Sequence, residues 1–127
     1  MKRIIISGFA TLGIACFVAT TGEAAELKDM LGKWKWTDYT TEVKECTTNP
    51  AGAGYCATVI DGPKNKGMEM IRSKLDKQGA DLVGKIAHPA TGEIYQTKLT
   101  LKNADTWTLD GCTDTGVCAK GDFVRVK

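Results

Sequence analysis

The sequence predicts an all-β domain, a small antiparallel up-and-down barrel of about eight short strands that follows a short helical turn. Three observations predict it: apolar and polar residues alternate along most of the chain after Gly32, turn residues recur roughly every 8 to 13 residues, and no segment there is long enough for a crossover helix. Closure into a barrel would remove exposed strand edges, and a two-sheet sandwich is the alternative.

The elements follow from this pattern in chain order. A single helical turn is expected over 26–31 and is ended by Gly32. Segment 68–75 has a composition that also suits a helix, but the turn signals around it leave room only for a strand. The clearest hairpin turn is Pro89-Ala90-Thr91-Gly92, with proline and glycine at their favoured turn positions. The expected strands are 33–40, 41–46, 54–61, 68–75, 81–88, 93–102, 106–112 and 117–126.

The first residues have the form of a secretory signal. Lys2 and Arg3 precede an apolar run over 4–18, and small residues Gly22 and Ala24 predict cleavage after Ala24. The run is shorter than the roughly 20 residues that cross a bilayer, which argues against a retained anchor. We therefore expect a signal peptide over 1–24, one domain over 25–127, a periplasmic or secreted location, and no stable membrane insertion after cleavage.

Removal of the leader takes Cys16 with it and leaves four cysteines. An even number of cysteines in a small exported domain predicts disulfides. We expect Cys46 to pair with Cys56 and Cys112 with Cys118, because each pair closes a short loop between two strands. The spacings do not resemble the close pairs of zinc sites, so no metal is expected.

Length and charge narrow the function classes. The chain has 127 residues, of which 25% are charged and 43% hydrophobic, a globular composition of one domain's length. The formal net charge of +2 is too small to hold a polyanion, so nucleic acid is not an expected partner. We expect a monomer.

The two ends of the domain carry residues that would meet if the sheet closes. Gly32-Lys33-Trp34 opens the first strand, and Arg125 lies near the C-terminus. In a closed barrel the guanidinium would lie across the indole and bond carbonyls left open by the helical turn. This Gly-x-Trp with a terminal arginine resembles the signature of the lipocalin and related calycin barrels.

A second resemblance covers almost the whole domain. From Gly32 the chain is similar to the secreted bacterial family known as domain of unknown function 2147. The shared landmarks are Gly32-Lys33-Trp34, Cys56-Ala57-Thr58-Val59, Gly84-Lys85-Ile86, Pro89, Thr91-Gly92, Tyr95, Gly111-Cys112, Cys118 and Arg125. His88, Glu93-Ile94 and Phe123 depart from the family pattern. The resemblance implies a small lipocalin-like barrel and says little about activity.

The sequence does not point to catalysis. His88 is the only histidine, and it precedes a turn, where an exposed polar residue is the ordinary occupant. A nucleophile-histidine arrangement would have to use it, yet nothing marks a partner. Acidic residues are scattered, and no glycine-rich phosphate loop joins a strand to a helix. We expect no enzymatic activity and no cofactor.

Binding is expected at the apolar and aromatic residues of the inward faces. The candidate ligand-binding residues, in the barrel interior or at its mouth, are Trp34, Trp36, Tyr55, Tyr95, Leu99, Leu101 and Trp107. A barrel of this strand number is either filled by side chains or holds one small ligand, and the sequence leaves both open. The first hypothesis is an exported protein that binds a small apolar or amphipathic molecule. The alternative is a periplasmic protein-interaction or inhibitor module with a filled barrel.

Overall fold

The computed structural model describes residues 24–127, and these form one curled antiparallel sheet behind a short 3-10 turn. The sheet has eight strands in the order β3-β2-β1-β8-β7-β6-β5-β4. The all-β fold predicted from the sequence is confirmed. The elements are η3 (Leu27–Met30), β1 (Gly32–Trp36), β2 (Tyr39–Glu45), β3 (Tyr55–Asp61), β4 (Asp76–Gln78), β5 (Asp81–Ala87), β6 (Ile94–Asn103), β7 (Thr106–Cys112) and β8 (Cys118–Arg125).

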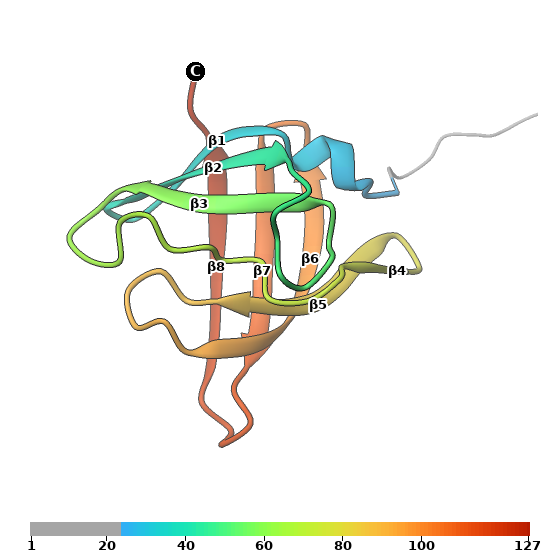
Figure 1. The fold of residues 1–127 in the computed structure, drawn as a ribbon. Coiled ribbons are helices and arrows are strands. Elements are labelled where there is room, and N and C mark those ends of the chain that lie inside the picture. The colour runs from blue at the N-terminus through green and yellow to red at the C-terminus, as the bar shows by residue number, and fades with distance from the viewer. Residues whose placement is uncertain (1–23) are drawn as a thin grey trace, which may run out of the picture.

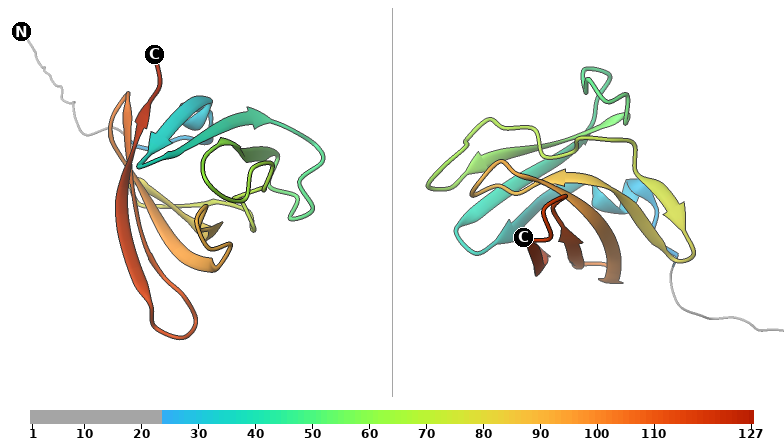
Figure 2. Two further views of the ribbon diagram at one scale, coloured as in Figure 1. Left: turned by 90° about the vertical axis from the view of Figure 1, so that its left-hand side faces the viewer. Right: turned by 90° about the horizontal axis from the view of Figure 1, so that it is seen from below.

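The sheet curls on itself, so that β1, β2 and β3 lie at a steep angle to β6, β7 and β8 (Figures 1 and 2). The space left between β3 and β5 is bridged by the irregular segment 67–72. Its Met70 N–H donates to the Ala57 carbonyl at 2.7 Å, and the Met70 carbonyl accepts from the Ala87 N–H at 2.7 Å. Backbone hydrogen bonds therefore continue around the molecule from β3 to β5, although this segment forms only isolated bridges.

The first and last strands meet as the sequence predicts. Trp34 of β1 pairs with Arg125 of β8, and the Arg125 Cζ lies 4.2 Å from the centroid of the Trp34 ring. The guanidinium donates to the Leu31 carbonyl at 2.9 Å, and the Trp34 Nε1–H donates to the Met30 carbonyl at 2.7 Å. Gly32 fits here because its φ is 121° and a Cβ would clash with the guanidinium. We call this arrangement the seam.

Both expected disulfides are present. Cys46 and Cys56 join the two ends of the loop between β2 and β3, with sulfurs 1.96 Å apart, and Cys112 and Cys118 join β7 to β8 at 2.01 Å. Disulfides are typical of proteins that fold in oxidising compartments. The expected signal peptide lies outside the described residues apart from Ala24, and so does Cys16. None of the helices in residues 24–127 has the length and apolar character to cross a membrane.

Two element predictions were wrong. The segment 33–40 is not one strand, because a two-residue turn at Thr37 and Asp38 separates β1 from β2. Thr37 adopts a φ of 51°, which is uncommon for a β-branched residue and carries no glycine signal in the sequence. The expected strand 68–75 is instead the irregular bridge described above, and the short edge strand β4 follows it.

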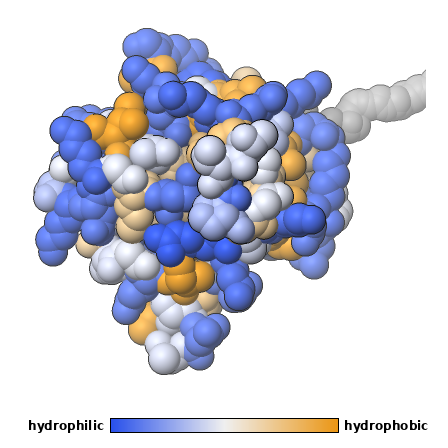
Figure 3. Space-filling view, viewed as in Figure 1, coloured by the Kyte–Doolittle hydropathy of each residue, from blue (hydrophilic) through white to orange (hydrophobic). Residues whose placement is uncertain are grey.

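The two ends of the barrel differ. At one end η3 packs beside β4, and the Lys77 ammonium pairs with the Glu26 carboxylate there (Figure 1). At the other end lie the β1–β2 turn and the loops that follow β3 and β5 (Figures 1 and 2). The face seen in Figure 3 is mostly hydrophilic, with small scattered hydrophobic areas. We call the end opposite η3 the mouth.

Candidate functional site

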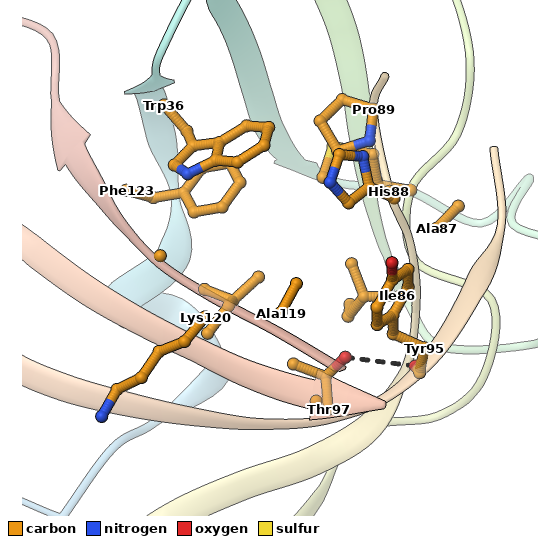
Figure 4. A pocket seen from close by; sticks show the side chains of 14 residues that line it. Trp36, Ile86, Ala87, His88, Pro89, Tyr95, Thr97, Ala119, Lys120 and Phe123 are labelled. Carbon is orange, nitrogen blue, oxygen red and sulfur yellow. Dashed lines mark hydrogen bonds between the residues drawn. The ribbon is translucent and has the colours of Figure 1, made fainter. Parts of the chain in front are cut away.

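A pocket opens at the mouth between two pairs of aromatic side chains. Trp36 and Phe123 lie on one side of it, and His88 and Tyr95 lie on the other, above Thr97 and Ala119 (Figure 4). We call it the mouth pocket. Its walls are almost entirely apolar, and its lining residues are Trp36, Met70, Ile86, Ala87, His88, Pro89, Tyr95, Thr97, Leu109, Gly111, Ala119, Lys120, Gly121 and Phe123.

Trp36 reaches the mouth because it is the last residue of β1. Its indole stacks on Phe123 with ring centroids 5.8 Å apart and planes inclined by 18°. The edge of the indole rests against Gly121 of β8, where a Cβ would collide with the ring nitrogen. Glycine at this position therefore lets the edge of the indole approach the backbone of β8 closely.

His88 directly follows β5 and is held by the turn that comes next. Its Nδ1 accepts the Ala90 N–H at 3.0 Å, so the neutral imidazole carries its proton on Nε2. The ring meets Trp36 edge-on at 5.0 Å and lies 5.6 Å from Tyr95. Desolvation lowers the pKa of His88 below 6.5, and the nearby Glu93 carboxylate partly offsets this effect. The imidazole is therefore neutral near pH 7 and offers an N–H donor at the mouth.

Tyr95 and Thr97 come from β6, where alternate residues face inward. The Thr97 hydroxyl donates to the Tyr95 carbonyl at 3.1 Å, as the dashed line in Figure 4 shows. Within residues 24–127, no hydrogen bond joins the Tyr95 hydroxyl or the His88 Nε2 to another protein group. The Lys120 ammonium is directed away from the pocket (Figure 4). The polar groups available to an occupant are therefore neutral.

A second cavity lies deeper in the barrel. It is walled by Trp34, Leu99 and Trp107 among other apolar residues, and it shares Met70, Ile86, Leu109 and Phe123 with the mouth pocket. We call it the inner cavity. Each of the two has a volume of about 60 Å³. Ligand pockets usually start near roughly 300 Å³. Side chains therefore occupy most of the barrel interior, a question that the sequence left open.

The structure separates the predicted binding residues into groups. Trp36 and Tyr95 line the mouth pocket, and Trp34, Leu99 and Trp107 line the inner cavity. Leu101 packs against the core and lines neither.

Tyr55 lies at the opposite end of the barrel, in a surface depression beside η3 that also includes Leu27. The sequence prediction placed it with the binding residues because it stands in the alternation of β3. Strand β3 runs toward the mouth, and Tyr55 is its first residue. Tyr55 therefore lies at the end of the barrel near η3.

The residues that the sequence prediction missed come from other elements. His88 and Phe123 complete the two aromatic pairs, and Met70 is one of the residues that line both cavities. Phe123 was recognisable from its place in the alternation of the last strand. His88 gave no signal, because its contact with Trp36 depends on how two distant strands cross.

A larger hollow lies outside the barrel. It is an open groove of about 690 Å³ across the outer faces of β4 to β7. Lys74, Lys85 and Lys98 line it together with Asp76 and Asp110, so opposite charges are mixed there. Within residues 24–127, no group of three histidine, cysteine or acidic side chains is placed to hold a metal ion.

No family model, curated protein or solved structure matches the chain. Function is therefore inferred from the geometry of the mouth pocket.

Proposed function

We propose that this protein is an exported, non-enzymatic binding protein that holds a small apolar or amphipathic ligand in the mouth pocket. The observation that carries the proposal is the open, apolar space between the Trp36–Phe123 pair and the His88–Tyr95 pair (Figure 4). When a ligand covers apolar surface that faces water, the free energy falls by about 25 cal/mol per Å² of surface covered.

The polar groups at the pocket support an amphipathic occupant. An apolar site that places a few polar groups can fix the orientation of a ligand, and His88 Nε2–H and the Tyr95 hydroxyl are such groups. Both are neutral, so they suit a hydroxyl, carbonyl or ether head better than an ion. The apolar part of the ligand would lie against Trp36 and Phe123.

Export is part of the proposal. The pattern of residues 1–24 is that of a signal peptide, and the two disulfides fit an oxidising compartment such as the periplasm. The resemblance to the lipocalin-like barrels and to the secreted family described above is likewise our proposal. The seam between Trp34 and Arg125 supports the first of these resemblances.

The experiment titrates the protein with hexanol and with benzyl alcohol and follows tryptophan emission. We expect saturable changes, because Trp36 forms a wall of the pocket. Tyr95→Phe removes one hydrogen bond to the alcohol and should weaken binding about fivefold. Tyr55→Phe is the matched control, since it makes the same chemical change at the other end of the barrel. Equal effects of the two variants, or no saturation by either alcohol, would overturn the proposal.

A second candidate function is a protein-interaction module, and the hairpin of β7 and β8 favours it. This hairpin projects from the barrel (Figure 1), the disulfide of Cys112 and Cys118 closes the loop at its tip, and Val117 in that loop is 53% exposed. A rigid, exposed loop binds a partner with little loss of conformational entropy. For such a module, cross-linking in an extract of exported proteins should give one partner with the wild type and with Tyr95→Phe, and lose it with Val117→Ser. Retention of the partner by Val117→Ser would exclude the hairpin.

A further inference from the structure

The inference concerns the class of ligand that the mouth pocket takes, and it rests on the function proposed above. The mouth pocket and the inner cavity are neighbours, because the same four residues line both: Met70, Ile86, Leu109 and Phe123. Each cavity alone is small, at about 60 Å³. Movement of one shared side chain would join them into a single narrow space that runs from the mouth into the core.

Met70 is the shared residue that can move. Its backbone N–H and carbonyl are bonded to Ala57 and Ala87, so the main chain is held on both sides. Its side chain is unbranched with three rotatable bonds, and its polar contact is a weak one from the Thr41 hydroxyl to the sulfur at 3.3 Å. Ile86 is branched, and Phe123 is fixed by stacking on Trp36. The partition between the cavities is therefore a flexible side chain on a fixed backbone.

The walls of the inner cavity determine what could enter it. They expose apolar surface and include no charged residue. The Trp34 Nε1–H is bonded to the Met30 carbonyl, and the Trp107 Nε1–H, which has no partner within residues 24–127, is too deeply buried to add polar surface to the cavity. The Thr41 hydroxyl donates to the Met70 sulfur and loses this weak contact when the Met70 side chain moves. The part of a ligand that passes Met70 therefore meets walls whose exposed surface is apolar, and this favours a hydrocarbon chain, since a polar group would lose its water there.

We propose that the ligand is a single-chain amphiphile. Its neutral head stays beside His88 and Tyr95, and its unbranched alkyl chain displaces the Met70 side chain and reaches Trp107 in the inner cavity. The site should reject a branched or fused-ring tail, because the other residues that line both cavities, Ile86, Leu109 and Phe123, are branched or held by stacking and cannot move aside as Met70 does. Met70 is the residue that sets the length of chain that the site accepts.

The first test measures affinity along the series butanol, hexanol, octanol and decanol. Each methylene that enters the inner cavity should strengthen binding about fourfold, which corresponds to about 0.8 kcal/mol per buried methylene. In the Trp36→Phe variant both remaining tryptophans, Trp34 and Trp107, line the inner cavity. Decanol should change the emission of this variant and butanol should not.

The second test stiffens the partition. Met70→Leu keeps the side-chain volume but cannot swing aside as methionine does, so decanol should bind about tenfold more weakly while butanol is unaffected. Met68→Leu is the matched control, because Met68 lines neither cavity. Met70→Ala, which removes the partition, should strengthen decanol binding in any fraction that folds.

The outcomes separate the two proposals. If no alcohol in the series and no benzyl alcohol binds, the proposed function fails. If benzyl alcohol binds in a Tyr95-dependent way but affinity does not rise beyond butanol, the function stands and the alkyl-chain proposal is overturned. Equal weakening of butanol and decanol by Met70→Leu would also overturn it.

Discussion

Two tryptophans of one short strand, Trp34 and Trp36, lie in opposite kinds of surroundings. Trp34 is 3% exposed, its ring is covered by Arg125, and its N–H is bonded to the Met30 carbonyl. Trp36 is half-buried, and its ring forms one wall of the mouth pocket, which is open to solvent. Every polar group of the seam has a partner, whereas the mouth keeps polar groups free beside apolar walls. The contrast is consistent with a seam that stabilises the fold and with the proposed binding role of the mouth.

The largest expected effect comes from truncating the buried tryptophan. Trp34→Ala should lower the free energy of unfolding by about 4 kcal/mol, because it removes a fully packed ring and uncovers Arg125. Trp36→Ala should lower it by only about 1.5 kcal/mol, since that ring is only partly buried. Urea denaturation of both variants measures the comparison. Similar losses would mean that the mouth is as structural as the seam.

A smaller effect is expected from Arg125→Lys, which sharpens the description of the seam. Lysine keeps the charge but cannot bond the Leu31 and Ala104 carbonyls together, so stability should fall by about 2 kcal/mol. Lys127→Gln is the control, because Lys127 also bonds Asp105 but takes no part in the seam. Its effect should stay within about 0.5 kcal/mol. An equal loss of stability in both variants would mean that Arg125 contributes only as a surface charge and not through its hydrogen bonds in the seam.

The smallest effect is the pH dependence at the mouth. Desolvation depresses the pKa of His88 below 6.5, so the unfolded chain binds more protons than the folded one just below that pH. The contribution of His88 to stability is complete above pH 6.5 and is lost as the pH falls through the folded pKa. The free energy of unfolding of His88→Asn should therefore fall less steeply with decreasing pH over this interval than that of the wild type. Titration of the carboxylates affects both proteins equally and cancels in the comparison.

The imidazole can also be followed directly by NMR. The His88 resonances should titrate below 6.5, and Glu93→Gln should move the pKa further down because the Glu93 carboxylate raises it. A pKa at or above 6.5 in the wild type would mean that the mouth is well hydrated and would weaken the contrast with the seam.

The seam was predictable and the mouth was only partly so, for a physical reason. Gly32, Trp34 and Arg125 form a recognisable local signal, since few residues other than arginine can cover an indole and bond carbonyls at once. The cysteine pairs were predictable from their spacing. The mouth depends on how β1 crosses β5 and β8, which brings His88 to Trp36 although 52 positions separate them. Alternation predicts which side chains of a strand face inward, but it does not predict which of them lie at the mouth.

The irregular segment 67–72 could not be predicted from the sequence for a related reason. Residues 67–72 bond to two strands at once through isolated contacts, and such a segment shows neither the alternation of a strand nor the period of a helix. Met70 was missed with it. The Thr37–Asp38 turn was missed because a threonine with positive φ is set by its surroundings rather than by its own preference.

The same bridging segment also protects the molecule from its own copies. An open sheet offers unpaired N–H and carbonyl groups that a second chain can extend, and segment 67–72 bonds several of those at Ala57 and Val59 of β3 and at Lys85 and Ala87 of β5. The margin that remains is β4, three exposed residues with the charged side chains of Asp76 and Lys77. A chain built this way leaves a second copy little free edge to extend.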